Sequence, residues 1–160
     1  MKNNKGITLV ALVITIIVLI ILAAVSLAAL TGDNSIITNA QKSKKDTEEK
    51  GAIEQINIAL SAIKTSATAK LVADGNYDVS AEDNKSIYSY TELGLKEGSA
   101  TAGYYIDSST IGTDGVIKIT YKDASLGIDV EGKIDFKLTK ADTSDATGTT
   151  YGTITPAAAK

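Results

Sequence analysis

Carboxylates are the side chains best suited to chemistry in this sequence, because it contains no His and no Cys. Thiol nucleophiles, His-centred triads, disulfides and Cys/His zinc sites are therefore excluded. Asp74, Asn76 and Asp78 have the spacing that opens a calcium-binding loop. Such a loop requires Gly at its sixth position and Glu at its twelfth, where this chain has Val79 and Lys85. We therefore predict no metal site, no cofactor and no catalytic residue, and we expect a protein that is not an enzyme.

The overall composition points to a scaffold with one small domain. A chain of 160 residues has room for one domain and an appendage. Hydrophobic residues make up 44% of it and aromatic residues only 5%, so its apolar content is aliphatic. The formal charge is −3, and every basic residue is Lys. An acidic chain without Arg is a poor candidate for binding nucleic acid.

Most of the aliphatic content lies in one block near the N-terminus. Residues 1–6 form a short leader with Lys2 and Lys5, and residues 7–30 then carry no charge. These 24 residues would form a helix about 36 Å long, enough to cross a hydrocarbon core of about 30 Å. The two lysines predict that the N-terminus stays in the cytoplasm and that the rest of the chain is exported.

Three interpretations fit this block. It could be an uncleaved signal anchor, or a secretory signal cut at Ser26-Leu27-Ala28. The second of these requires an apolar core of roughly 7–15 residues, and this one is longer. The third interpretation rests on the junction itself, where a basic leader ends in Gly6 and the apolar helix begins at Ile7.

Over KGITLVALVITIIVLIILA, the sequence resembles type IV prepilins and the related pseudopilins. Residues 31–50, TGDNSIITNAQKSKKDTEEK, are similar to pilin-type proteins of Gram-positive bacteria. The resemblance implies that a prepilin peptidase cuts between Gly6 and Ile7 and that the new amine of Ile7 is N-methylated. It also implies a membrane platform protein and an assembly ATPase as partners, and a homo-oligomeric helical filament as the product. The subunit would be a single-pass membrane protein before assembly and part of a surface filament afterwards.

One position departs from the family pattern. The fifth residue of the mature chain is usually Glu, which pairs with the N-terminal amine of a neighbouring subunit, and here it is Ala11. A carboxylate in the membrane costs about 2.5–3.5 kcal/mol unless it is paired, so pairing sets the register of assembly. Ala11 supplies no such signal. Ala24 and Ala28 share one helix face and would let a neighbouring helix approach closely, although Ala is also simply a good helix former.

The next segment, residues 31–72, reads as an amphipathic helical stalk. Gly32, Asp33 and Ser35 predict a break near residues 31–35. Beyond it, an apolar stripe follows the helical repeat and predicts a face that packs on a globular head; its residues are Ile53, Ile56, Leu60, Ile63 and Ala67. The charged residues 41–50 carry no such stripe and are expected to face solvent, or else to match charges on a neighbouring stalk.

Residues 73–160 predict an antiparallel sheet of three to five strands, so the fold class is α+β, with the long N-terminal helix packed on a small sheet. We expect strands at 103–108 and 116–122, with a turn at Asp114-Gly115, and short strands or ordered loop at 76–80 and 86–90. We also expect one helical turn at 92–96. A last edge strand is predicted at 151–155, stopped by Pro156.

The phase of alternation across Gly132 decides between two topologies. Leu126, Ile128 and Val130 alternate with acids before Gly132, and Ile134, Phe136 and Leu138 continue the alternation after it. A two-residue hairpin loop would place Val130 opposite Lys133 and mix core with solvent. A single strand bent at Gly132 keeps the apolar side chains inside, as would a three-residue loop. We favour the bent strand.

Two functions are therefore expected. The first is a structural subunit of a type IV pilus or pilus-like filament, whether it serves adhesion or secretion. The second is a signal-anchored, single-pass membrane protein with an extracellular binding module that does not polymerise, and Ala11 favours this alternative.

Overall fold

The computed structural model describes residues 5–31, 36–74, 79, 81–107, 109, 111, 115–135 and 153–160. The chain divides into two compact units, one ending at Lys44 and the other beginning at Lys45, and each is considered by itself. Several predicted features lie outside the described residues: the centre of the calcium-like loop, all of the possible strand at 76–80 except Val79, Asp114, and the apolar positions Phe136 and Leu138.

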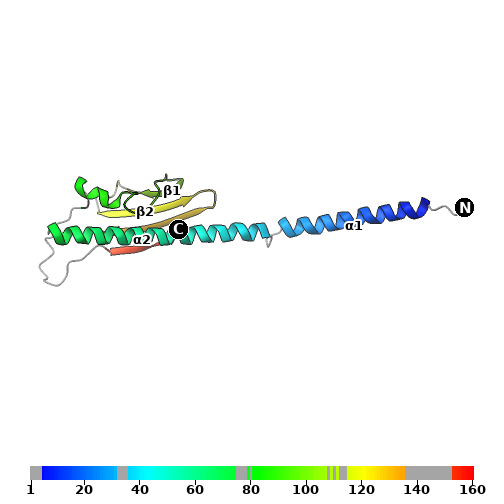
Figure 1. The fold of residues 1–160 in the computed structure, drawn as a ribbon, viewed down its shortest axis with the longest axis horizontal. Coiled ribbons are helices and arrows are strands. Elements are labelled where there is room, and N and C mark those ends of the chain that lie inside the picture. The colour runs from blue at the N-terminus through cyan, green and yellow to red at the C-terminus, as the bar shows by residue number, and fades with distance from the viewer. Residues whose placement is uncertain are drawn as a thin grey trace. The chain divides into compact units, whose positions relative to one another are not determined.

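Two long helices form the N-terminal part of the chain (Figure 1). Helix α1 spans Lys5–Thr31 and helix α2 spans Ile36–Asp74. The predicted break at residues 31–35 falls between them, and residues 32–35 are outside the described part of the chain.

The second unit contains four antiparallel strands in the order β1-β2-β3-β4. They are β1 (Ala102–Ile106), β2 (Val116–Asp123), β3 (Ile128–Asp135) and β4 (Thr153–Ala159). A tight turn at residues 124–127 joins β2 to β3, and Gly127 adopts a φ of +62° there. Asp123 stabilises the turn by accepting a hydrogen bond from the backbone N–H of Ser125 at 2.9 Å.

The α+β class predicted from the sequence is confirmed, because α2 packs along one face of this sheet (Figure 1). The predicted stripe lies in the core: Ile56, Leu60, Ile63 and Ala67 are fully buried, and Ile53 is half-buried. From the sheet, the matching face is aliphatic and includes Ile117, Ile119, Ile128, Val130 and Ile134. A three-stranded or larger sheet needs such a cover on its apolar face, and α2 supplies it.

The bent-strand topology is also confirmed, because β3 runs without interruption through Gly132. At Gly132, α2 packs closely against the sheet. A Cβ atom at this position would lie 2.7 Å from Cγ2 of Ile56 and 2.9 Å from Cδ1 of Leu60. Only a residue without a side chain allows α2 to pack this closely against β3.

The prediction that Pro156 stops the last strand is wrong. Strand β4 continues through Pro156 to Ala159 and pairs with β3 on both sides of it. The pairing register shifts between Glu131 and Lys133, so Pro156 and Ala157 together stand opposite Gly132 in a β-bulge. Proline is tolerated there because β4 is an edge strand and the bulge needs no ladder hydrogen bond from it.

Three local predictions also need correction. The expected strand or loop at 86–90 is instead mostly a 3₁₀ helix, η1 (Glu82–Tyr88), and Leu126 belongs to the β2–β3 turn rather than to a strand. The helical turn expected at 92–96 lies slightly earlier. It ends at Gly94, whose φ is +65°, with hydrogen bonds from Gly94 N–H to Thr91 and from Leu95 N–H to Tyr90. This Schellman arrangement terminates the turn.

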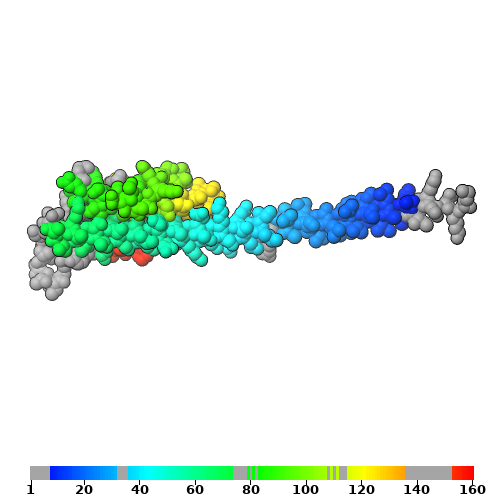
Figure 2. Space-filling view, viewed as in Figure 1, coloured from blue at the N-terminus to red at the C-terminus, as the bar shows by residue number. Residues whose placement is uncertain are grey.

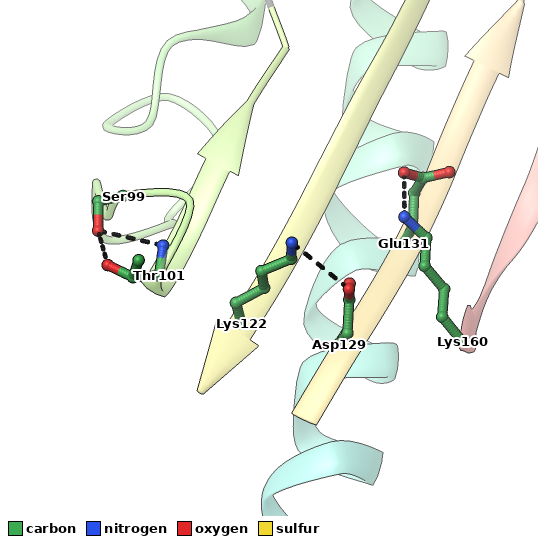
Figure 3. A network of polar contacts seen from close by, with 6 residues as sticks. All are labelled: Ser99, Thr101, Lys122, Asp129, Glu131 and Lys160. Carbon is green, nitrogen blue, oxygen red and sulfur yellow. Dashed lines mark hydrogen bonds and ion pairs between the residues drawn. The ribbon is translucent and has the colours of Figure 1, made fainter. Parts of the chain in front are cut away.

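The other face of the sheet carries charged side chains. Lys122 pairs with Asp129 at 3.5 Å and Lys160 with Glu131 at 2.8 Å, across neighbouring strands (Figure 3). The outer edge of β1 is covered by its own chain, since residues 98 and 99 and the Tyr90 hydroxyl bond to it. This covered edge and the proline in β4 both oppose edge-to-edge pairing between sheets.

Candidate functional site

The most unusual surface of this protein is the bare apolar helix α1. Every side chain described in it, from Thr8 to Thr31, is exposed, and the large aliphatic ones expose about half of their surface or more. Figure 2 shows one face of this helix, with its side chains at the surface. The core of the second unit begins only at Ala52 and is complete without them.

Hydrogen bonds inside α1 leave little polar surface. Thr15 donates its hydroxyl hydrogen to the Leu12 carbonyl, and Thr31 donates to the Leu27 carbonyl, both at 2.8 Å. A helix satisfies its own backbone groups, and back-bonding of this kind satisfies hydroxyl groups in the absence of water. Among the described residues, α1 supplies the single stretch long and apolar enough to cross a membrane. Its surface suits either lipid or other apolar helices.

The predicted cleavage site lies at the start of this helix. Gly6 and Ile7 belong to the first turn of α1, which begins at Lys5. The first N–H groups of a helix have no partner within it, and Gly weakens a helix by about 1 kcal/mol relative to Ala. The Gly6–Ile7 bond therefore lies in the first turn of α1, where backbone N–H groups have no partner within the helix.

The structure brings together two of the three predicted assembly residues. Ala24 and Ala28 are both exposed and lie one turn apart on the same face of α1. Ala11 is exposed too, but it precedes Ala24 by thirteen residues, about 20 Å along the axis, and points in another direction. Ala11 and the Ala24–Ala28 pair are thus separate features of the helix.

Sequence analysis missed a second surface, on α2. A shallow, mainly apolar groove runs along the side of this helix and is lined by Lys50, Ile53, Glu54, Asn57, Ile58 and Ser61. Asn57 also accepts a hydrogen bond from the backbone N–H of Ala157 at 2.9 Å, which places the groove beside β4. The signal that could have revealed it is Ile58, a large apolar residue outside the buried stripe and 55% exposed.

Two tyrosines mark the opposite flank of the interface between α2 and the sheet. The rings of Tyr104 and Tyr121 lie 4.6 Å apart between centroids and are tilted by 48°. Burial raises the pKa of both hydroxyl groups. For Tyr104 the neighbouring Tyr121 and then Glu48 add to the increase, and for Tyr121 Glu48 and then Asp123 do so. Both phenols therefore stay neutral over the physiological pH range and act as packing groups.

No group of three or more acidic side chains able to hold a metal ion occurs among the described residues. Comparison of the chain with family models, with curated proteins and with solved structures found no match.

Proposed function

We propose that this chain is a structural subunit of a type IV pilus-like filament. On this proposal, a prepilin peptidase cuts between Gly6 and Ile7, and the amine of Ile7 is methylated. Helix α1 holds the subunit in the membrane and later packs against other α1 helices in the filament core. The second unit forms the outer surface of the filament.

The observation that carries the proposal is the contrast between the two units. Soluble monomers rarely expose apolar patches larger than a few hundred Å², yet the whole described surface of α1 is exposed and aliphatic. The sheet unit, by contrast, has its own buried core and a charged outer face. An apolar helix attached to a self-sufficient head is suited to a subunit that moves from lipid into a helical bundle. The resemblance at residues 5–22 and the α+β architecture support the same assignment.

A membrane-anchored binding module that does not polymerise is the second candidate. Ala11 favours it, because the chain lacks the carboxylate that pairs subunits in the family it resembles. The two functions differ in where the mature protein accumulates.

Shear fractionation distinguishes them. Filament subunits are released when intact cells are sheared, whereas an anchored module stays with the membranes. We expect the wild-type chain in the sheared fraction and a Gly6→Val variant in the membrane fraction, because processing is blocked. Gly51→Ala, an exposed position on α2 with no atom within 4 Å of the added Cβ, is the matched control and should behave as the wild type. Detection of the wild-type chain in membranes alone would favour the anchored module.

A further inference from the structure

We propose that the side face of α2 binds the α2 helix of a second copy of this chain, in parallel and shifted along the helix axis by four residues. The side face comprises Asp46, Lys50, Ile53, Glu54, Asn57, Ile58 and Ser61. The inference rests on the proposed filament function and adds to it the axial register between neighbouring subunits.

Charges alternate along the side face. Asp46, Lys50 and Glu54 follow one another at intervals of four residues, so they lie on one side of the helix with signs −, + and −. All three are exposed. In the part of the chain that the structure describes, none of these three side chains takes part in an ion pair. Their charges remain available to a partner.

Stabilisation of the helix itself explains the pattern poorly. Opposite charges four residues apart support a helix best when the acid precedes the lysine. Asp46 and Lys50 follow that order, but Lys50 and Glu54, as well as Lys45 and Glu49, have the reverse order. The sequence repeats the reverse order at two further pairs, Lys42 with Asp46 and Lys44 with Glu48.

The same spacing makes the segment complementary to a shifted copy of itself. Without a shift, a parallel copy would place each charge against the same charge. A shift of four residues, about 6 Å, places Asp46 against Lys50 and Lys50 against Glu54. A shift of three would oppose Asp46 to Glu49, and a shift of eight would oppose Asp46 to Glu54. Of the four shifts compared, only a shift of four residues places the charges of the side face against charges of the opposite sign.

The parallel orientation follows from α1. Both copies carry their apolar helix at the N-terminal end, so two subunits in one membrane point the same way. An antiparallel pair centred on Lys50 would moreover bring Asp46 of one copy against Glu54 of the other. Like charges in direct contact oppose such an arrangement.

Apolar contact accompanies the charges. Ile58 is 55% exposed and Ile53 is half-buried, and both line the groove beside β4. With a shift of four residues, Ile58 of one copy is level with Ala62 of the other, which is exposed and small. The two helices can therefore approach closely while the Ile58 side chain loses contact with water.

A shifted parallel contact has a consequence for assembly. It joins different residues on the two partners, so each subunit leaves one half of the contact free for the next. Contacts of this heterologous kind produce open helical filaments when the rotation does not close a ring. The side face thus supplies an axial register in a chain that has Ala11 in place of a pairing carboxylate.

Cysteine cross-linking measures the shift directly, because the natural chain has no Cys. Ser61 and Thr65 are exposed, four residues apart, and uncharged, and their hydroxyl groups bond only to the helix backbone. Full-length Ser61→Cys and Thr65→Cys chains are produced together in one strain, and each is also produced alone. After mild oxidation of the sheared filaments, we expect a disulfide dimer in the mixed strain. Single-variant strains should give about ten-fold less, because an offset of about 6 Å exceeds the Cβ–Cβ reach of a disulfide.

The possible outcomes separate this inference from the proposed function. Dimers that form equally well with Ser61→Cys alone would show unshifted helices and overturn the inference. Filaments without any cross-link would also overturn it and leave the filament function intact. If the chain is absent from the sheared fraction, the filament function fails, and the same cross-link measured in membranes then decides the inference by itself.

Charge reversal provides an independent test. Lys50→Glu would face Asp46 and Glu54 of neighbouring copies, and we expect it to lower the yield of sheared filament about ten-fold. Lys96→Glu changes the net charge equally at an exposed position outside the side face and should leave the yield unchanged. An equal loss in both variants would contradict a specific contact at the side face.

Discussion

Asn57 on α2 and Ala157 on β4, one hundred residues apart in the sequence, are joined by a hydrogen bond of 2.9 Å between the Asn57 side-chain oxygen and the Ala157 backbone N–H. This bond satisfies a backbone donor that the bulge around Pro156 removes from the β3–β4 ladder. It also fastens the edge strand to the helix that covers the sheet. The C-terminal strand is therefore held from two sides, by β3 and by α2.

Loss of this bond should loosen β4 selectively. We expect Asn57→Leu to destabilise the protein by about 1–3 kcal/mol, because the N–H of the buried Ala157 loses its partner. Asn57→Asp keeps an acceptor oxygen and should lose much less. Hydrogen exchange of the Ala157 amide, compared with the amide of Ile119 in the central strand β2, provides the measurement. Unchanged protection of Ala157 in Asn57→Leu would show that the bond contributes nothing.

A methyl group at Gly132 should be poorly tolerated. The added Cβ would meet Ile56 and Leu60 at less than 3 Å, so α2 would have to move away from the sheet. We expect Gly132→Ala to destabilise the head by about 1–3 kcal/mol in urea unfolding followed by circular dichroism. Gly51→Ala, where the added Cβ meets no atom within 4 Å, should stabilise α2 by about 0.5–1 kcal/mol. Equal stability of the two variants would rule out the tight helix–sheet contact.

Stability should fall at alkaline pH. Burial raises the pKa of Tyr104 and of Tyr121 above the ordinary tyrosine value of 10.0, so the folded state holds their protons more tightly than the unfolded state. Their contribution is thus fully present below pH 10 and is lost as the pH rises through the folded-state pKa values. We expect the decline above pH 10 to be shallower in Tyr104→Phe. Thermal unfolding of the wild type and of Tyr104→Phe, measured against pH, provides the comparison, and equally steep declines would contradict a contribution from Tyr104.

Larger side chains on one face of α1 should affect assembly and not the stability of the head. We expect a chain with both Ala24→Leu and Ala28→Leu to unfold in urea like the wild type, because the head core begins at Ala52. Its filaments should be scarcer, because a neighbouring helix can no longer approach that face closely. Urea unfolding and the yield of sheared filament are measured on the same preparations. A lower head stability would show that α1 contributes to the folded core.

Local patterns in the sequence were sufficient to predict much of this fold. The stripe from Ile53 to Ala67 and the alternation in β2 each concern neighbouring residues, and both identify core faces correctly. The phase across Gly132 argued against a two-residue hairpin, which would have mixed core with solvent, but it left both a continuous strand and a three-residue loop open; the structure has the continuous strand. The depth of α2 against Gly132 could not be predicted in this way, since it depends on atoms 70 or more residues apart.

The wrong prediction at Pro156 and the missed groove on α2 have the same physical origin, since both depend on contacts between residues that are distant in the sequence. Pro156 stops a strand when its neighbours need its N–H, but here it lies in a bulge of an edge strand, where no such donor is needed. The N–H of the next residue, Ala157, is satisfied by the side-chain oxygen of Asn57, which is distant in the sequence. The apolar groove on α2 was missed because Ile58 lies outside the buried stripe, and its position beside β4 depends on residues far away in the sequence. For α1, by contrast, composition alone indicated an apolar helix, and the structure leaves it uncovered.

Mass spectrometry of the N-terminal peptide, from protein sheared off intact cells, tests directly whether the chain is processed and assembled as a filament subunit. A filament subunit processed as proposed gives a peptide that begins at Ile7 and is heavier by one methyl group. A peptide that still begins at Met1, recovered only from membranes, would contradict the account in favour of a signal-anchored module. A peptide that begins at Ala29 would show ordinary secretion without α1, and the filament proposal would then fail.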